Sequence, residues 1–164
     1  MDLAEMEKRL RVLEDIEEIK KLHVYYVDCI IKTQWDEATD CFAENGTFDA
    51  HAGIARGKKA VYDIFTKEIY KNHIGMEGLI SVHPNITVDG DTATGSWLLY
   101  IQYALPRTLE VKLDQLHSND APDWIQGYYD MKYIREDGKW KISYLKFRCR
   151  LWSPISEKDS APVR

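Results

Sequence analysis

His83 stands in a segment of this sequence where a side chain could take a proton from a bound molecule. The segment LISVHPNITVDGDTATGSWLLYIQYA, residues 79–104, predicts two strands joined by a tight turn, with His83 beside Pro84 in the first strand. An imidazole with an unperturbed pKa of about 6.5 can accept a proton at neutral pH. A strand histidine can equally be a surface residue or a packed one, so three roles are open.

Side chains are expected to alternate between the two faces along the whole first strand, so that His83 shares a face with Ser81. The length of the turn decides where His83 points. A two-residue turn places His83 opposite Ser96, whereas a three-residue turn places it opposite Trp97, among aromatic side chains. Pro84 favours an edge strand or a bulge at this point, and pocket residues are often found beside bulges. Both registers are compatible with the sequence.

Three polar side chains on a predicted first helix are further candidates. The phenol of Tyr26 can hold a leaving hydroxyl or polarise a carbonyl in a dry pocket, or it can simply fill the core. His23 precedes Tyr26 by about one turn on nearly the same face, and it can line the pocket or pack. Asp28 can pair with His83 only if the helix is suitably rotated. At ~100° per residue it lies ~160° from Tyr26, on another face.

The elements that must position these groups follow from periodicity. Apolar residues recur at steps of three and four over residues 4–33, which predicts a long helix whose inner face carries Leu10, Leu13, Ile16, Ile19, Leu22, Tyr26 and Ile30. A short helix (34–43), a short strand (47–51), a loop (53–57) and a third helix (57–73) are expected next.

Two hairpins complete the pattern. The second has strands over residues 124–136 and 139–152, and a loop over about 106–122 separates it from the first. Helices segregated from an antiparallel sheet predict an α+β domain, with three N-terminal helices packed on a strongly curved, mainly antiparallel sheet. Such a sheet wrapped over a long helix makes a cone with one open end.

The predicted strands carry more aromatic side chains than a small core needs. They line a pocket for an apolar ring compound or form a subunit interface. We expect substrate contacts from Trp97, Tyr103 and Tyr129, and from Phe48 on the short strand. Arg148 can bind a carboxylate or phenolate, or form ion pairs at a subunit seam.

Composition narrows the class of protein. The 164 residues suffice for one domain, expected over 1–152 with a polar tail at 153–164. A net charge of −5 and the lack of basic runs argue against nucleic acid, and no apolar run approaches the ~18 residues of a membrane span. Three cysteines without CxxC spacing indicate reduced thiols in a cytoplasmic protein. The histidines lack metal-ligand spacing, and no nucleotide-cofactor motif is present.

Four stretches, in this order, resemble the SnoaL-like branch of the NTF2-like superfamily: LEDIEEIKKLHVYYVDC, WDEATDCFAENGTFD, HPNITVDGDTATGSWLL and YIREDGKWKI. The likeness is closest to cofactor-free lyases, namely bile-acid 7α-dehydratases, scytalone dehydratase and hexachlorocyclohexane dehydrochlorinases. It implies an NTF2-like cone, a homotrimer, no cofactor, and proton abstraction followed by loss of a leaving group. The fold hosts enzymes and binding modules alike, so the function needs its own argument.

The resemblance carries over to individual residues unevenly. The dehydratase tyrosine of the first helix falls on Tyr26, but the aspartate that orients the catalytic histidine falls on Ile31. The catalytic histidine itself falls a few residues before His83. An acid that some relatives carry in the hairpin falls on Ile101, and the late arginine falls beside Arg148. We therefore include Ile31 and Ile101 among the expected pocket residues.

The leading hypothesis is a cofactor-independent lyase that dehydrates a hydrophobic cyclic or aromatic alcohol. His83 would be the base, Asp28 the nearest carboxylate, and Tyr26 and Tyr129 the groups that stabilise developing negative charge. A C–C lyase or isomerase in the same pocket is an alternative. A non-catalytic small-molecule-binding module is another, favoured by the apolar Ile31 and Ile101.

Overall fold

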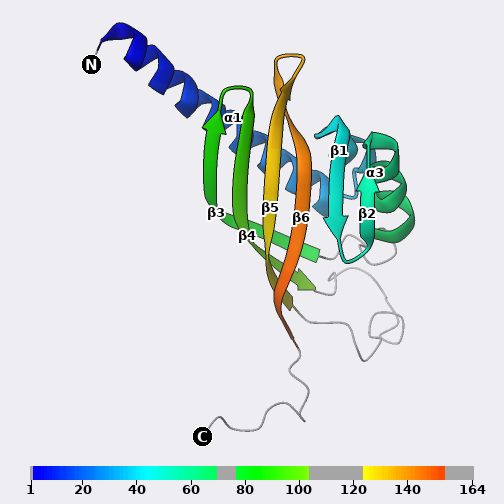
Figure 1. The fold of residues 1–164 in the computed structure, drawn as a ribbon. Coiled ribbons are helices and arrows are strands. Elements are labelled where there is room, and N and C mark those ends of the chain that lie inside the picture. The colour runs from blue at the N-terminus through cyan, green and yellow to red at the C-terminus, as the bar shows by residue number, and fades with distance from the viewer. Residues whose placement is uncertain (1, 70–76, 104–123, 154–164) are drawn as a thin grey trace, which may run out of the picture.

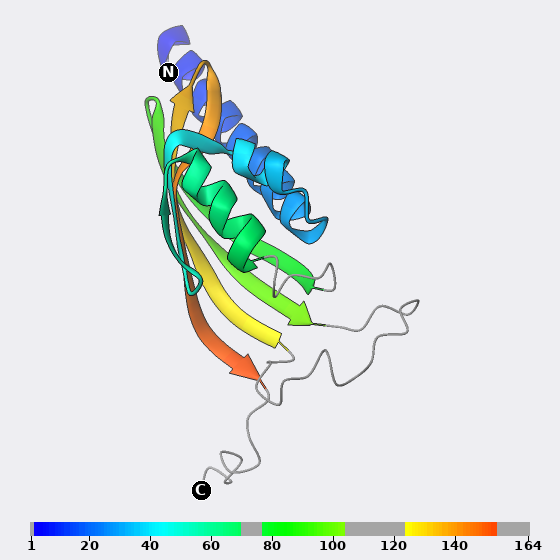
Figure 2. The same cartoon turned by 90° about the vertical axis from the view of Figure 1, so that its right-hand side faces the viewer.

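The computed structural model describes residues 2–69, 77–103 and 124–153, in which helices cover one face of a curved sheet (Figures 1 and 2). The elements in chain order are α1 (Leu3–Ile31), α2 (Trp35–Asp40), β1 (Phe42–Ala50), β2 (Gly53–Arg56), α3 (Lys58–Ile64), η1 (Phe65–Ile69), β3 (Glu77–Asp89), β4 (Thr92–Tyr103), β5 (Trp124–Glu136) and β6 (Lys139–Ser153). The α+β prediction, with three helices packed on the sheet, is confirmed.

The sheet has six strands in the order β2-β1-β6-β5-β4-β3. β1 runs parallel to β6 and every other neighbouring pair is antiparallel, so the sheet is mainly antiparallel, as predicted. Residues 53–56 form the edge strand β2, where the sequence suggested a loop. A strand of four residues is too short to show a clear alternation, and only its pairing with β1 defines it.

Both long hairpins turn through two residues. Asp89 pairs with Thr92, so Gly90 and Asp91 form the first turn. Asp137 and Gly138 form the second turn and have φ values of 50° and 75°. A type I′ turn needs positive φ at both central residues, and its twist matches that of the strands it joins.

A bulge interrupts β3 at His83 and Pro84. Val82 pairs with Leu98 and Asn85 with Ser96, so both bulge residues stand opposite the single residue Trp97. The extra residue exchanges the two faces of β3. Ser81 faces the helices before the bulge, and Ile86 packs against the core after it. The uniform alternation expected from the sequence is therefore wrong for this strand.

Helix α1 lies against the sheet through its C-terminal half. Its buried residues include Ile19, His23, Tyr26 and Ile30. Leu10 and Leu13, expected on the inner face, are instead 58% and 60% exposed. The helix begins well beyond the edge of the sheet, so its first turns project away from the core (Figure 1).

A buried ion pair fixes the middle of α1 to the second hairpin. Asp15, only 5% exposed, accepts hydrogen bonds from the guanidinium of Arg135 and, at 3.2 Å, from the indole nitrogen of Trp140. The guanidinium lies 4.6 Å from the centre of the Trp140 ring and 3.3 Å from Asp91. This network attaches the middle of α1 to β5 and β6.

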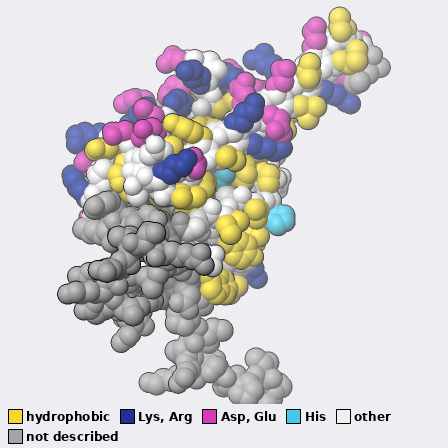
Figure 3. Space-filling model, turned by 180° about the vertical axis from the view of Figure 1, so that it is seen from behind, with side chains coloured by type: hydrophobic (Ala, Val, Ile, Leu, Met, Phe, Trp, Pro, Cys, Tyr) yellow, Lys and Arg dark blue, Asp and Glu magenta, His cyan; other side chains and the backbone are white. Residues whose placement is uncertain are grey.

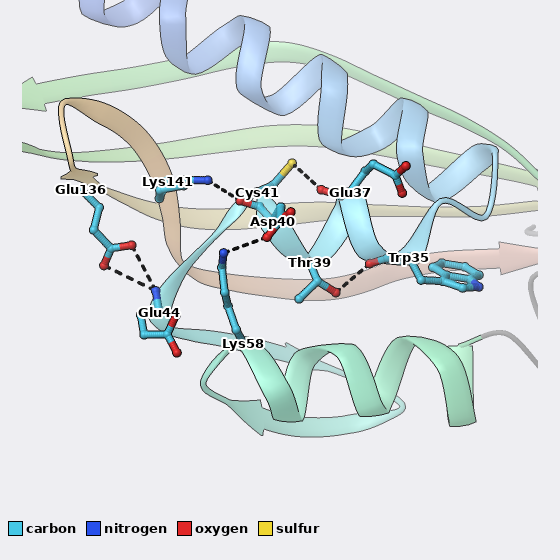
Figure 4. Close-up of polar contacts among 9 residues, drawn as sticks. All are labelled: Trp35, Glu37, Thr39, Asp40, Cys41, Glu44, Lys58, Glu136 and Lys141. Carbon is cyan, nitrogen blue, oxygen red and sulfur yellow. Dashed lines mark hydrogen bonds and ion pairs between the residues drawn. The ribbon is translucent and has the colours of Figure 1, made fainter.

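Polar contacts join α2, β1 and α3 near the β2–β1 edge of the sheet, on the face that α1 also covers (Figure 4). Lys58 on α3 pairs with Asp40 at 2.9 Å, and the backbone nitrogen of Glu44 donates to the Glu136 carboxylate at 3.2 Å. After α3 the chain continues through one π-helical turn, η1. The rest of the predicted third helix, all of the predicted 106–122 loop and all but the first residue of the 153–164 tail lie outside the described residues.

Candidate functional site

The most unusual polar group in the interior is the imidazole of His23, which is 1% exposed. Its ring stacks on Trp97 with centroids 3.7 Å apart and planes inclined by 8°. Its Nε2 lies 2.7 Å from the hydroxyl oxygen of Ser81, on β3 before the bulge. Within the described ranges, its Nδ1 has no hydrogen-bond partner. Buried polar nitrogens are rarely left unsatisfied, so this atom is a candidate contact for a ligand group or water.

Aromatic rings surround this histidine on the remaining sides. Tyr26 lies one turn further along α1 with its ring centroid 6.5 Å from that of His23, and Tyr129 on β5 lies at 6.1 Å. The two tyrosine rings are 6.4 Å apart and meet edge to face. Phe147 on β6 extends the cluster at 5.9 Å from Tyr129. Together with Trp97 and Ser81, these residues form the His23 cluster.

The indole of Trp97 is held in place by a chain of buried hydrogen bonds. Its nitrogen donates to the hydroxyl of Tyr133 at 3.0 Å, and that hydroxyl donates to the sulfur of Met131 at 3.1 Å. Burial raises the pKa of Tyr133 above its ordinary value, so the phenol stays protonated. The surface on which His23 stacks is therefore fixed.

Burial controls the protonation of the cluster. It lowers the pKa of His23 from 6.5 to about 3, so the imidazole is neutral at pH 7. Burial also raises the pKa of Tyr26 well above its ordinary value. Within the described residues, no carboxylate forms a hydrogen bond or ion pair with His23. The cluster is therefore uncharged and keeps its hydrogen-bonding capacity for neutral partners.

A neutral imidazole can act in two ways, depending on its tautomer. If Ser81 donates to Nε2, then Nδ1 carries a proton and can donate to a carbonyl or phenol oxygen. If Nε2 donates to Ser81, then Nδ1 has a free lone pair and can accept a proton. Neutral imidazoles polarise carbonyls in enzyme sites where burial or a helix terminus keeps them uncharged.

The structure brings together four of the residues predicted from the sequence: Tyr26, His23, Trp97 and Tyr129. Phe48, Ile101 and the half-buried Ile31 belong to the surrounding hydrophobic core. Phe48 connects to Tyr26 through Phe42, which contacts both rings. The side chain of Tyr103 lies outside the described residues.

Three predicted site residues lie elsewhere. His83 is exposed in the bulge with a φ of 52°, so the edge strand turns its ring to the surface and away from Tyr26. Asp28 pairs with Lys32 at 2.5 Å, with 47% of its side chain exposed, and does not orient His83. Arg148 stands on the outer face of the sheet, where it pairs with Asp130.

Two members of the cluster were not found by sequence reasoning: Ser81 and Phe147. Both carry ordinary side chains whose relevance depends on which face of the strand is inward. The Pro84 signal for a bulge was present in the sequence, and the bulge lets Ser81 face inward while His83 lies at the surface.

A cleft of about 520 Å³ lies away from this cluster, between the projecting end of α1 and the β5–β6 turn. It is lined by Glu7, Leu10, Arg11, Glu14, Asp15, Glu18, Arg135 and Gly138. It shares no residue with the His23 cluster. Its lining is mostly charged and open to water, which weakens electrostatic interactions, so the buried cluster is the better candidate for chemistry.

Among the described residues, no three His, Cys, Asp or Glu side chains are grouped closely enough to hold a metal ion. In the same part of the chain, no helix combines the length and apolar character needed to cross a membrane.

Solved structures define the class of fold. An NTF2-like protein with a cystatin-like fold from Novosphingobium aromaticivorans matches with a TM-score of 0.71 and 18% identity, over 98% of this chain and 97% of that one. A hexachlorocyclohexane dehydrochlorinase, LinA-type3, from Novosphingobium barchaimii matches with a TM-score of 0.74 and 16% identity, over 94% and 99%. A Mycobacterium tuberculosis protein of unknown function matches with a TM-score of 0.64 and 21% identity, over 92% and 79%.

These similarities establish an NTF2-like fold. The family model of the SnoaL-like domain matches residues 11–146, and the chain therefore belongs to the SnoaL-like domain family.

Proposed function

We propose that this protein is a cofactor-independent lyase or isomerase acting on a hydrophobic cyclic or aromatic small molecule that carries an oxygen function. The observation that supports this most directly is the buried, uncharged imidazole of His23, which lies among aromatic side chains and whose Nδ1 has no hydrogen-bond partner among the described residues. The family and the dehydrochlorinase neighbours make chemistry of this kind plausible.

In the simplest reaction, the ring compound lies against the aromatic side chains of the His23 cluster. The Nδ1 lone pair of His23 removes a proton from the carbon next to an activating carbonyl. The bond from the neighbouring carbon to its hydroxyl breaks as the alkene forms, and a phenol, from Tyr26 or Tyr129, protonates the departing hydroxide to give water. The imidazolium then returns its proton to the tyrosinate, so the protein ends in its starting state.

The lowered pKa of His23 determines which substrates suit this site. An imidazolium is costly in a buried, uncharged cluster unless negative charge develops beside it. A substrate whose intermediate is an enolate or phenolate supplies that charge at the required moment. We therefore expect activated ring ketones, thioesters or phenols rather than simple alcohols.

A second candidate function is non-catalytic binding of the same class of molecule. The pKa of about 3 makes His23 a weak base in the free protein, and no described carboxylate orients it. A neutral imidazole that only donates or accepts one hydrogen bond would suffice to select an oxygenated ring compound.

A screen of hydroxylated sterols, bile-acid thioesters and hydroxylated aromatic diols tests both candidates. Thermal stabilisation reports binding, and a new conjugated-alkene absorbance reports elimination. His23→Phe keeps the ring stacked on Trp97 but removes both nitrogens, whereas His83→Asn alters only an exposed histidine and is the matched control. We expect His23→Phe to lose turnover and His83→Asn to retain it. Turnover that survives His23→Phe and disappears in His83→Asn would overturn the assignment.

A further inference from the structure

The projecting end of α1 carries exposed apolar side chains that the protein's own core does not use. They recur at steps of three and four residues and are Leu3 (68% exposed), Met6 (44%), Leu10 (58%) and Leu13 (60%). We call this set the α1 stripe. Figure 3 shows hydrophobic side chains interleaved with charged ones along this end of the helix. A contiguous exposed apolar stripe on a helix is typical of an interaction surface.

The α1 stripe faces away from the sheet. At ~100° per residue, its four members centre ~170° around the helix from the buried face that carries Ile19 and Tyr26. One edge of the stripe borders the cleft at the β5–β6 turn, which Leu10 helps to line, but Leu10 is still 58% exposed and the sheet of the same molecule leaves the stripe uncovered. The projection of the helix beyond the sheet leaves it accessible (Figure 1).

The spacing of the stripe fits a coiled-coil seam. Leu3 and Leu10 are seven residues apart and take the a positions of a heptad, and Met6 and Leu13 take the d positions. Val24, 64% exposed, falls at a later a position of the same register. A seam of this kind needs an identical or similar helix opposite it. The α1 helix of a second molecule of this protein meets that requirement.

The charges beside the stripe select the direction of that second helix. Glu7 and Glu14 occupy the e flank and Arg9 the g flank. In a parallel pair, e faces g, so Arg9, which pairs with Glu5 of its own helix at 2.9 Å, would also meet Glu14 of the second copy. In an antiparallel pair, e faces e and g faces g, which sets like charges against each other. Asp2 is the other residue on the g flank. Its carboxylate caps the N-terminus of the helix, where it accepts a hydrogen bond from the Glu5 backbone nitrogen at 2.8 Å.

We propose that two copies of this protein associate through the α1 stripe as a short parallel coiled coil, a different assembly from the homotrimer that the family resemblance implies. The two-fold axis runs along the helix pair, and the two sheets lie on its outer sides. The seam has only two consecutive apolar heptads, so we expect a weak interface with a dissociation constant on the order of micromolar.

Analytical ultracentrifugation of the protein from about 1 to about 100 µM tests whether it associates through the α1 stripe. We expect the wild-type protein to dimerise across this range, and the double variant Leu10→Ser/Leu13→Ser to raise the dissociation constant at least ~10-fold with an unchanged melting temperature. Lys8→Ser, exposed on the opposite side of the same helix, is the matched control and should associate normally. A wild-type monomer throughout, or association unaffected by the double variant, overturns the proposal.

Two further variants test the parallel direction. Arg9→Glu should weaken association and Arg9→Glu/Glu14→Arg should restore it, because the two charges exchange places across the seam. In a background with Cys149→Ser, which removes the exposed native thiol, Leu10→Cys should form an intermolecular disulfide with itself, since a positions meet in register. Failure of the charge exchange to restore association, or absence of the Leu10→Cys disulfide, overturns the parallel seam.

Discussion

The neutrality of His23 predicts a specific dependence of stability on pH. Its pKa is about 3 in the folded protein, against 6.5 for the ordinary value that applies when the chain unfolds. Between these values the unfolded chain binds one more proton than the folded one, so the free energy of unfolding rises with pH across this window. This contribution of His23 to the free energy of unfolding is complete above pH 6.5, and it is lost progressively as the pH falls towards 3.

The magnitude follows from the two pKa values. Over the full window the contribution reaches roughly 4–5 kcal/mol, at 1.36 kcal/mol per pKa unit. Between pH 7.5 and pH 5.0 it amounts to about 2 kcal/mol. This second figure depends almost entirely on the pKa of His23 in the unfolded chain, because the imidazole of the folded protein stays neutral down to pH 5.

Urea unfolding followed by tryptophan fluorescence measures this effect. The free energy of unfolding is measured for the wild-type protein and for His23→Phe at pH 7.5 and at pH 5.0. The change between the two pH values in the variant is then subtracted from the change in the wild-type protein. Losses common to both pH values, such as the hydrogen bond to Ser81, cancel in this difference. We expect His23→Phe to be about 2 kcal/mol less sensitive to pH, a difference of about 1 M in urea midpoint.

His83→Asn is the control for this measurement, since its ring is exposed and asparagine tolerates the positive φ of 52°. It should keep the wild-type sensitivity. If His23→Phe loses stability between pH 7.5 and pH 5.0 as steeply as the wild-type protein, then His23 is not a buried neutral imidazole, and the reasoning about the site fails with it.

Three stability predictions concern the frame around the site. Asp15→Ala should cost about 3 kcal/mol in urea unfolding, because it removes the buried carboxylate that the Arg135 guanidinium contacts and leaves the indole of Trp140 without its acceptor. Asp28→Ala at an exposed pair should cost less than about 0.5 kcal/mol, and equal losses would contradict the buried ion pair. Tyr133→Phe should cost about 1–2 kcal/mol by removing the acceptor of Trp97, and an unchanged melting temperature would argue against that bond. Gly46→Ala should cost about 1–3 kcal/mol, since its new Cβ would lie 2.9 Å from each of two backbone oxygens, and a neutral effect would mean that the backbone yields there.

The hairpins show where sequence reasoning worked well. The strands predicted over 124–136 and 139–152 match β5 and β6 to within one residue. Long runs of β-branched and aromatic residues separated by Asp137-Gly138 define such a hairpin locally, because few residue pairs adopt positive φ at both turn positions. The local chain carries all the information that this element needs.

The site was predicted only in part, for reasons visible at His83 and His23. The choice of His83 as base assumed one uninterrupted alternation along β3, and the bulge of one extra residue breaks it. His23 was recognised as a pocket candidate on α1, but its central position depends on Trp97 and Ser81, which come from two other strands. Contacts between residues this distant in the sequence leave no local pattern to read.

The sequence by itself determined the fold class and the long hairpins, because periodicity, turn chemistry and propensity act over a few neighbouring residues. Only the tertiary structure decided which polar side chains became neutral and enclosed. That outcome depends on how α1 packs on the sheet, to which the Asp15–Arg135 pair attaches it, and on the register of β3. A shift of one residue at the bulge moves Ser81 or His83 between the interior and the water, and burial then sets the protonation of whatever lies inside.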